Sequence, residues 1–209
     1  MSLLDSWDQI ESWLQTYAPA SYASLPAPAD PDAIRSAQDT TGLTFPEELV
    51  ISLSRHDGSG EFILPVFHRL SSARTVADEY QRLCLVERER HQQAAGRHGA
   101  TSGEAVLPPE EGHYYWNPHW IPFGYDESGN SLFISLAADE TNGRVGVHEK
   151  DGGGSLNQHP VFASLEALLK AVADGLNKGT MEIWGEWQMQ VDHAGYLDWR
   201  SLDGDTDTT

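Results

Sequence analysis

Hydrophobic and polar positions alternate most clearly between residues 115 and 137. Two short arms have a hydrophobic side chain at every second position, at Ile121, Phe123, Tyr125, Leu132, Ile134 and Leu136. This period of two is typical of β-strands, and the aromatic residues suit a half-buried sheet surface. We therefore predict a hairpin that turns at residues 126–130. Pro122 removes a backbone donor from the first arm, so we expect an edge strand or a β-bulge there.

Elsewhere, hydrophobic residues recur at spacings of three and four, which predicts amphipathic helices. The expected helices cover residues 2–17, 30–42, 44–56, 72–95 and 164–179. Asp30 and Gly42 suit the two ends of the second helix, and Thr44 and Glu47 have the spacing of a capping box for the third. Residues 18–29 are rich in proline, alanine and serine, and we expect them to form a loop.

The remaining strands are predicted from shorter runs. They cover residues 61–66 and 143–150, followed by a terminal hairpin over 181–200 that turns at 192–195. The connections between the strands of the central region are too short for parallel crossovers. The predicted fold is therefore α+β, with a mostly antiparallel sheet flanked by helices.

The length of the chain bounds its organisation. A sequence of 209 residues can bury one substantial hydrophobic core without disulfide support. We expect a single domain over residues 1–202, with a mobile loop near 96–112 where glycine, proline and glutamate gather. Residues 203–209 are expected to be a disordered acidic tail.

The charge of the chain narrows the class of partner. Thirty-two acidic residues against thirteen basic ones give a formal net charge of −19. This balance disfavours nucleic acid and anionic membranes and favours a basic protein partner, although acidity that serves solubility alone accounts for the number nearly as well. No run is long and apolar enough to span a bilayer, and the first residues lack the basic stretch of a secretion signal. A cytoplasmic location is the expectation.

Motifs of the common enzyme classes do not occur in the sequence. It has no Gly-x-Ser-x-Gly elbow, no phosphate-binding Gly-x-x-x-x-Gly-Lys-Ser/Thr loop and no dinucleotide-binding glycine motif. The single cysteine, Cys84, falls on the apolar side of a predicted helix, which favours a buried structural thiol over a nucleophile. Asp57 and Glu61 could form an acid–base pair, but their spacing does not fix their separation. We predict no catalytic residue and no enzymatic activity.

Two segments have some features of metal sites. Glu87 and His91 are four residues apart on a predicted helix, but the neighbouring Arg88 and Arg90 favour a solvated, ion-paired face. Residues 126–130 have the composition of a calcium loop, but the glycine comes too early and the closing glutamate is missing. We predict neither a metal nor another cofactor.

Several stretches, in this order and spacing, together resemble the SUKH superfamily, which is named for yeast cell-wall-assembly regulators and bacterial syd-like and immunity proteins. They are Trp7, Ile10 and Trp13 in the first helix, residues 41–49 (TGLTFPEEL) before 56–58 (HDG), residues 120–123 (WIPF) before 126–130 (DESGN), and residues 164–169 (SLEALL). The resemblance spans roughly residues 7 to 178 and implies an α+β fold with an antiparallel sheet flanked by helices. It implies no shared catalytic residue.

The same resemblance implies a function in binding. Bacterial members commonly act as immunity proteins that block a polymorphic toxin, often a nuclease or a deaminase, whereas eukaryotic members scaffold cell-wall signalling. We therefore predict an immunity protein, with a scaffold or regulatory protein as the alternative. The expected partner-binding residues are Asp57, Glu61, Trp116, Asp126 and Glu127, near the ends of strands. The oligomeric state and the role of the polar region 87–112 stay open.

Overall fold

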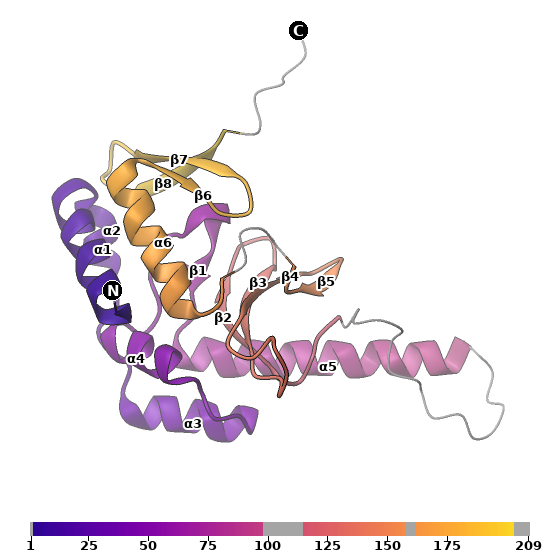
Figure 1. Cartoon of the computed structure of the whole chain (residues 1–209). Coiled ribbons are helices and arrows are strands. Elements are labelled where there is room, and N and C mark those ends of the chain that lie inside the picture. The colour runs from indigo at the N-terminus through magenta and orange to yellow at the C-terminus, as the bar shows by residue number, and fades with distance from the viewer. Residues whose placement is uncertain (1, 98–114, 158–161, 203–209) are drawn as a thin grey trace, which may run out of the picture.

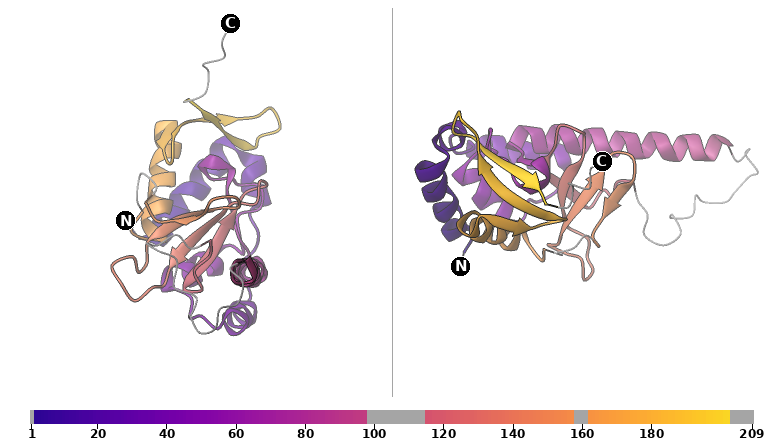
Figure 2. Two further views of the ribbon diagram at one scale, coloured as in Figure 1. Left: turned by 90° about the vertical axis from the view of Figure 1, so that its right-hand side faces the viewer. Right: turned by 90° about the horizontal axis from the view of Figure 1, so that it is seen from above.

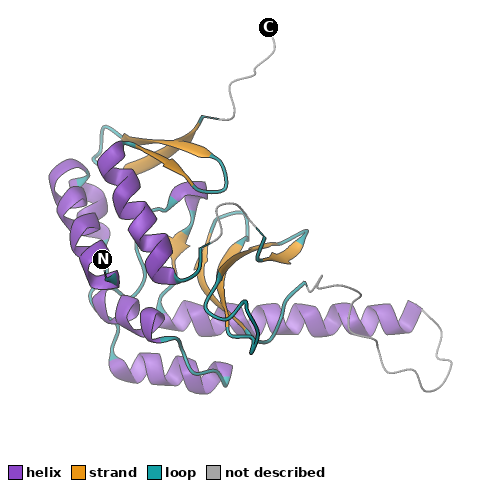
Figure 3. Ribbon diagram, viewed as in Figure 1, coloured by secondary structure: helices purple, strands orange, loops and turns teal. Residues whose placement is uncertain are grey.

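The computed structural model describes residues 2–97, 115–157 and 162–202. Its helices are α1 (Leu3–Tyr17), α2 (Pro19–Ser24), α3 (Pro31–Thr41), α4 (Glu47–Arg55), α5 (Ala73–Arg97) and α6 (Leu165–Lys178), with a short 3-10 helix η1 (Pro65–Phe67). Its strands are β1 (Arg69–Leu70), β2 (Trp120–Tyr125), β3 (Ser131–Ser135), β4 (Val145–Glu149), β5 (Gly153–Ser155), β6 (Thr180–Glu182), β7 (Glu186–Val191) and β8 (Leu197–Ser201). Figures 1 and 3 show the helices packed around two separate sheets, so the predicted α+β class is confirmed.

The larger sheet contains the predicted central hairpin. Its strand order is β1-β2-β3-β4-β5, and all neighbouring strands are antiparallel. Pro122 pairs with Phe133 and Gly124 pairs with Leu132, so Phe123 is the extra residue of a β-bulge. The bulge expected at Pro122 is therefore confirmed, because the sheet absorbs the missing backbone donor at an irregular position.

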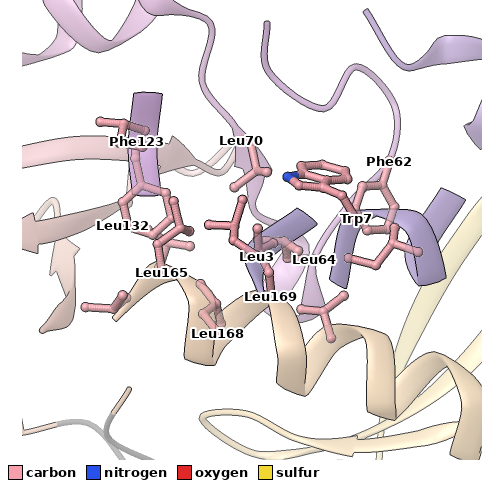
Figure 4. Close-up of a cluster of buried hydrophobic side chains, with 14 of the residues drawn as sticks. Leu3, Trp7, Phe62, Leu64, Leu70, Phe123, Leu132, Leu165, Leu168 and Leu169 are labelled. Atoms are coloured by element: carbon pink, nitrogen blue, oxygen red, sulfur yellow. The ribbon is translucent and has the colours of Figure 1, made fainter. Parts of the chain in front are cut away.

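One face of this sheet belongs to the main hydrophobic core. Phe123 and Leu132 of the sheet lie across from Leu165 and Leu168 of α6, as Figure 4 shows. Trp7 of α1 is fully buried in the same core and donates a hydrogen bond from Nε1 to the Ser52 hydroxyl of α4, at 3.2 Å. The amphipathic stripe of α1 is thus directed at the centre of the molecule, as its spacing predicts.

The opposite face of the sheet is also covered. The sequence predicted a half-buried hairpin, with one face open to solvent. Trp120 and Phe133 on this face form a second hydrophobic cluster with Leu83 of α5 and with Trp116. The long helix α5 lies along this side of the sheet and extends beyond it (Figure 1). Both faces of β2 and β3 are therefore removed from solvent.

Most helix ends are where the capping signals place them. Asp30 accepts a hydrogen bond from the Asp32 backbone at the start of α3, and Gly42 ends that helix with φ +69°. Ser164 and Gly179 cap α6 in the same way. The capping box predicted for Thr44 is wrong, because Pro46 is the N-cap of α4 and no side chain caps that helix.

Three further predictions need correction. Residues 18–29 are not entirely a loop, because Pro19 occupies the first turn of α2, where its missing N–H costs nothing. Residues 61–66 are not a strand: the backbone N–H of Phe62 donates to Ser59 and that of Leu64 to His68, and η1 follows. The terminal hairpin exists as β7 and β8, but β6 joins it to make a separate three-stranded sheet.

This second sheet is attached to the rest of the molecule at several points. The Leu197 backbone N–H donates to the Ser21 hydroxyl at 2.8 Å, and Trp199 Nε1 donates to the Ile63 carbonyl at 3.0 Å. Figure 2 shows the sheet beside α1 and α6. The start of the chain and its last strands therefore form one packed region.

Two expected segments fall largely or wholly outside the described residues. Within the loop expected near 96–112, residues 96–97 are the last residues of α5, and the rest is not described; the same is true of the whole tail at 203–209. No helix in the described part of the chain is long and apolar enough to cross a membrane.

Candidate functional site

Two glutamates from distant parts of the chain meet at one arginine. Arg69 of β1 donates from Nη2 to Glu61 at 2.9 Å and from Nη1 to Glu127 at 3.0 Å. The sheet brings them together, because Arg69 pairs in register with Tyr125, shortly before the turn that carries Glu127. The Arg69 side chain is 20% exposed, whereas Glu61 and Glu127 are 58% and 83% exposed. The carboxylates thus face solvent above a largely covered guanidinium.

Arg69 and Glu127 line a cleft of about 300 Å³ together with Ile63, Asp126 and Ser128, and Glu61 pairs with the same arginine. We call this hollow the acidic cleft. The Asp126 carboxylate is held within its own turn, because it accepts hydrogen bonds from the backbone and the side chain of Asn130 at 2.9 and 2.8 Å. The hydrogen bond to Glu127, with that to Glu61, raises the pKa of Arg69 above its usual value. One cation therefore faces three carboxylates, which leaves two negative charges uncompensated.

A strained and polar region lies next to the acidic cleft. His68 is 1% exposed, and neither ring nitrogen has a hydrogen-bond partner among the described residues. Burial lowers the pKa of His68 to about 4, against the attraction of Asp126. The centroid of the His68 ring lies 6.2 Å from that of Trp184. Trp184 and Val66 are the two non-glycine residues with a positive φ in the described part of the chain. Such strain often gathers at functional sites, because the surrounding packing must hold it in place.

The structure brings together three of the five residues predicted to bind a partner. Asp126 and Glu127 line the acidic cleft, and Glu61 pairs with Arg69, which also lines it. Asp57 instead accepts a hydrogen bond from the Ala73 backbone at 2.7 Å, which caps the start of α5. The prediction that Trp116 contacts a partner needs correction. Trp116 precedes β2, and its side chain is 0% exposed in the second hydrophobic cluster.

Sequence reasoning did not find the residue at the centre of the cleft. Arg69 lies in the stretch ILPVFHRLSS, where it and His68 interrupt a hydrophobic run. A lone arginine in such a run is a signal for a paired cation, because a charge that is mostly covered needs a partner. The sequence alone cannot tell that its partners lie 8 and 58 residues away.

A second hollow lies along α5. It has a volume of about 690 Å³ and is lined by Tyr80, Gln81, Cys84, Leu85, Glu87, Arg88, His91, Trp116 and Pro118. We call it the α5 groove. Cys84 lines it and is half-buried, so the prediction of a buried thiol is wrong. On this helix His91 Nε2 lies 2.9 Å from Glu87 Oε1, and the contact is an ion pair only when the imidazole is protonated.

The described residues offer little for metal chemistry or for acid–base catalysis. Within them, no group of three or more histidine, cysteine, aspartate or glutamate side chains could hold a metal ion. Asp57 and Glu61 have different partners, the α5 backbone and Arg69 respectively. Each of these two carboxylates is therefore held by its own donor.

Comparison with known families adds an independent observation. The family model described as SMI1 / KNR4 family (SUKH-1) matches residues 28–171. The chain belongs to this family. The SMI1 / KNR4 match runs from just before α3 into the first half of α6, so it contains every residue of the acidic cleft and of the α5 groove. Helices α1 and α2 and strands β6 to β8 lie outside it. No curated protein matches the chain.

Proposed function

We propose that this chain is a non-enzymatic binding protein, an immunity protein that binds and neutralises a basic toxin in the cytoplasm. The observation that carries the proposal is the acidic cleft, where exposed carboxylates exceed the available cations. Glu61 and Glu127 come from segments far apart in sequence, yet both are directed at one arginine at the molecular surface. Membership of the SMI1 / KNR4 family supports the same class of function.

The cleft suits a lysine or arginine side chain of a partner. Glu61 contacts Arg69 through Oε2 and Glu127 contacts it through Oε1, so a second oxygen of each carboxylate can accept from a cationic side chain of the partner. Arg69 holds both carboxylates in place before the partner arrives, which lowers the entropy lost on binding. The site is therefore organised in advance for a basic side chain.

The class of toxin follows from the charge. A nuclease, or a deaminase that acts on nucleic acid, must carry cations to bind phosphates. An acidic protein can occupy that same surface and block access to the substrate. The net charge of −19 also accelerates the encounter with such a partner at low ionic strength. The proposed mechanism is occlusion, and it requires no chemistry from the chain.

The test uses the toxin domain that the neighbouring gene is expected to encode, at the C-terminus of a secreted modular protein. Co-expression of the full chain is expected to restore growth of cells that produce this domain, and the two purified proteins are expected to form a complex. The double variant Glu61→Gln/Glu127→Gln should slow association by about tenfold at low salt, because it removes the uncompensated charge of the cleft.

The matched control is Glu140→Gln/Glu182→Gln, which makes the same change of charge at two exposed glutamates outside the cleft. If both double variants slow association equally, the cleft has no special role and only the net charge matters. If no complex forms at low salt and growth is not restored, the immunity function is wrong. A scaffold function predicts that last result together with binding to a housekeeping protein.

A further inference from the structure

We propose that the α5 groove is a binding site for a small aromatic anion. The proposal is independent of the toxin-binding function, because the groove and the acidic cleft share no lining residue. Three features carry it: the volume and lining of the groove, an unpaired N–H donor at its wall, and an unpaired arginine.

The volume and lining suit a small molecule with an apolar body. The groove of about 690 Å³ falls within the range of roughly 300–1,000 Å³ that is typical of small-molecule sites. Its walls include the rings of Tyr80 and Trp116 together with Leu85 and Pro118. Leu85 is 51% exposed and gives a bound ring an apolar surface to cover.

The unpaired donor is the indole nitrogen of Trp116. Its side chain is 0% exposed, and Nε1 has no hydrogen-bond partner among the described residues. A buried donor without a partner is unfavourable, so an acceptor that reaches it is stabilised. Cys84 packs against the cluster that contains Trp116, its thiol lines the groove, and burial raises the pKa of that thiol.

The unpaired cation is Arg88. It forms no ion pair with any of the described carboxylates, and its charge acts on the nearby Cys84 thiol. The groove also contains Glu87, but both oxygens of that carboxylate are engaged: Oε1 with His91 and Oε2 with the Trp116 backbone N–H at 3.3 Å. Glu87 and Arg88 carry opposite charges at the groove, and Arg88 is the one of the two without a described partner.

The charge of the whole helix agrees with this. The α5 segment, residues 73–97, contains five arginines and four carboxylates and carries +1, so the remainder of the chain carries −20. A polyanion such as nucleic acid would be repelled by that remainder. A small anion would not, because charges beyond roughly 8 Å are screened at physiological ionic strength. An aromatic ring against Trp116 and Leu85, with its acidic group near Arg88, satisfies all of these features.

The test uses 8-anilinonaphthalene-1-sulfonate as the probe, since it combines aromatic rings with one sulfonate. The full chain is expected to bind one molecule of the probe, measured by fluorescence titration. Cys84 is the single cysteine, so its alkylation by neutral iodoacetamide reports on the groove alone. Bound probe should slow this alkylation, and prior modification of Cys84 with N-benzylmaleimide should abolish probe binding.

Two variants on α5 locate the charge. Arg88→Gln should weaken probe binding by about tenfold, the loss expected for one charge-assisted hydrogen bond. The control is Arg74→Gln, which removes the same charge from the same helix at a residue that is 89% exposed, lies outside the groove and pairs only with Asp78. Equal thermal stability of both variants and the wild type shows that folding is not the cause of any difference.

Three results would overturn the proposal. The first is equal weakening by both variants, and the second is a rate of Cys84 alkylation that the probe does not change; either places the probe elsewhere on the chain. The third is a dimer in sedimentation experiments that dissociates in Arg88→Gln, which would make a second copy of the chain the occupant of the groove.

Discussion

Trp120 stacks on Phe133 across two neighbouring strands, with ring centroids 4.1 Å apart and ring planes 18° apart. Each ring also covers a glycine of the same sheet, because Trp120 lies over Gly154 and Phe133 lies over Gly146. A Cβ atom built on either glycine would approach the ring more closely than real Cβ atoms do. The stack and the two glycines are therefore a single packing unit on the sheet face that α5 covers.

Gly146→Ala and Gly154→Ala are expected to destabilise the protein by about 1–3 kcal/mol each, the usual cost of overpacking a core. Gly152→Ala is the control, because its Cβ would meet only the side chain of Glu149, which can move. Its effect should stay within about 0.5 kcal/mol. Urea unfolding of the three variants measures this, and an equal cost for Gly152→Ala would show that the rings do not decide the result.

Two buried histidines predict a pH dependence of stability. Burial lowers the pKa of His68 to about 4, and burial with the nearby charge of Arg82 does the same for His148. The unfolded chain then binds more protons than the folded one between pH 6.5 and 4. The free energy of unfolding is therefore fully present above pH 6.5, and each histidine removes about 1.4 kcal/mol per pH unit as the pH falls through that window.

Urea unfolding at pH 7.5, 6.0 and 5.0 tests this, above the range where most carboxylates titrate. The variant His148→Phe keeps an aromatic ring beside Tyr115 and Trp116 and should flatten the slope by the contribution of one histidine. The exposed His193→Gln serves as the matched control. A slope that His148→Phe leaves unchanged would mean that His148 is not held neutral by the fold.

The region matched by the family model is not expected to fold alone. A fragment of residues 28–171 lacks α1, the second half of α6 and the second sheet. Trp7, Ile10 and Leu14 of α1 are all 0% exposed, and Trp7→Ala alone should cost about 3–5 kcal/mol. Circular dichroism and amide NMR spectra should show the fragment unfolded, whereas a chain ending at residue 202 should keep its stability. A folded fragment would contradict this account of the core.

Two arginine–glutamate pairs should differ in their effect on stability. Arg55 of α4 contacts Glu11 of α1 at 2.5 and 2.8 Å, and the Glu11 side chain is only 16% exposed. Arg69 contacts Glu127 through one nitrogen, and Glu127 is 83% exposed. Double-mutant cycles of unfolding should give a coupling of about 1 kcal/mol or more for the first pair and below about 0.5 kcal/mol for the second. The reverse order would assign the acidic cleft a structural role.

Local signals in the sequence were sufficient where the structure is set by neighbouring residues. Asp30 and Gly42 cap α3, and Pro122 marks the bulge, because the backbone at each point depends on the residue itself. The short hydrophobic run at 61–66 failed as a strand signal because the hydrogen-bond partners of this segment, among them the Ser59 carbonyl, are not those of a sheet. Pattern alone cannot identify those partners.

The candidate site was also predicted only in part: its acidic residues were found from the sequence, but its arginine was not. The acidic residues Glu61, Asp126 and Glu127 stood out by charge near strand ends; Asp126 and Glu127 line one cleft, and Glu61 pairs with its arginine. Their link through Arg69 depends on the pairing of β1 with β2. A strand of two residues is too short to be predicted from its sequence pattern. Trp116 was expected to bind a partner, and nothing in its own segment indicates that a distant helix packs over it.

The hydrogen bond between Ser21 and Leu197 has a consequence for the synthesis of the chain. It joins residues 176 positions apart, and the Ala20 N–H donates to the Gly195 carbonyl beside it at 3.1 Å. At roughly 5–20 residues per second, the ribosome needs about 10–35 s to deliver the second partner after the first has been made. During that time, part of the apolar face of α1 lacks the residues that bury it in the folded protein. The nascent chain therefore completes its packing only when its last strands have emerged.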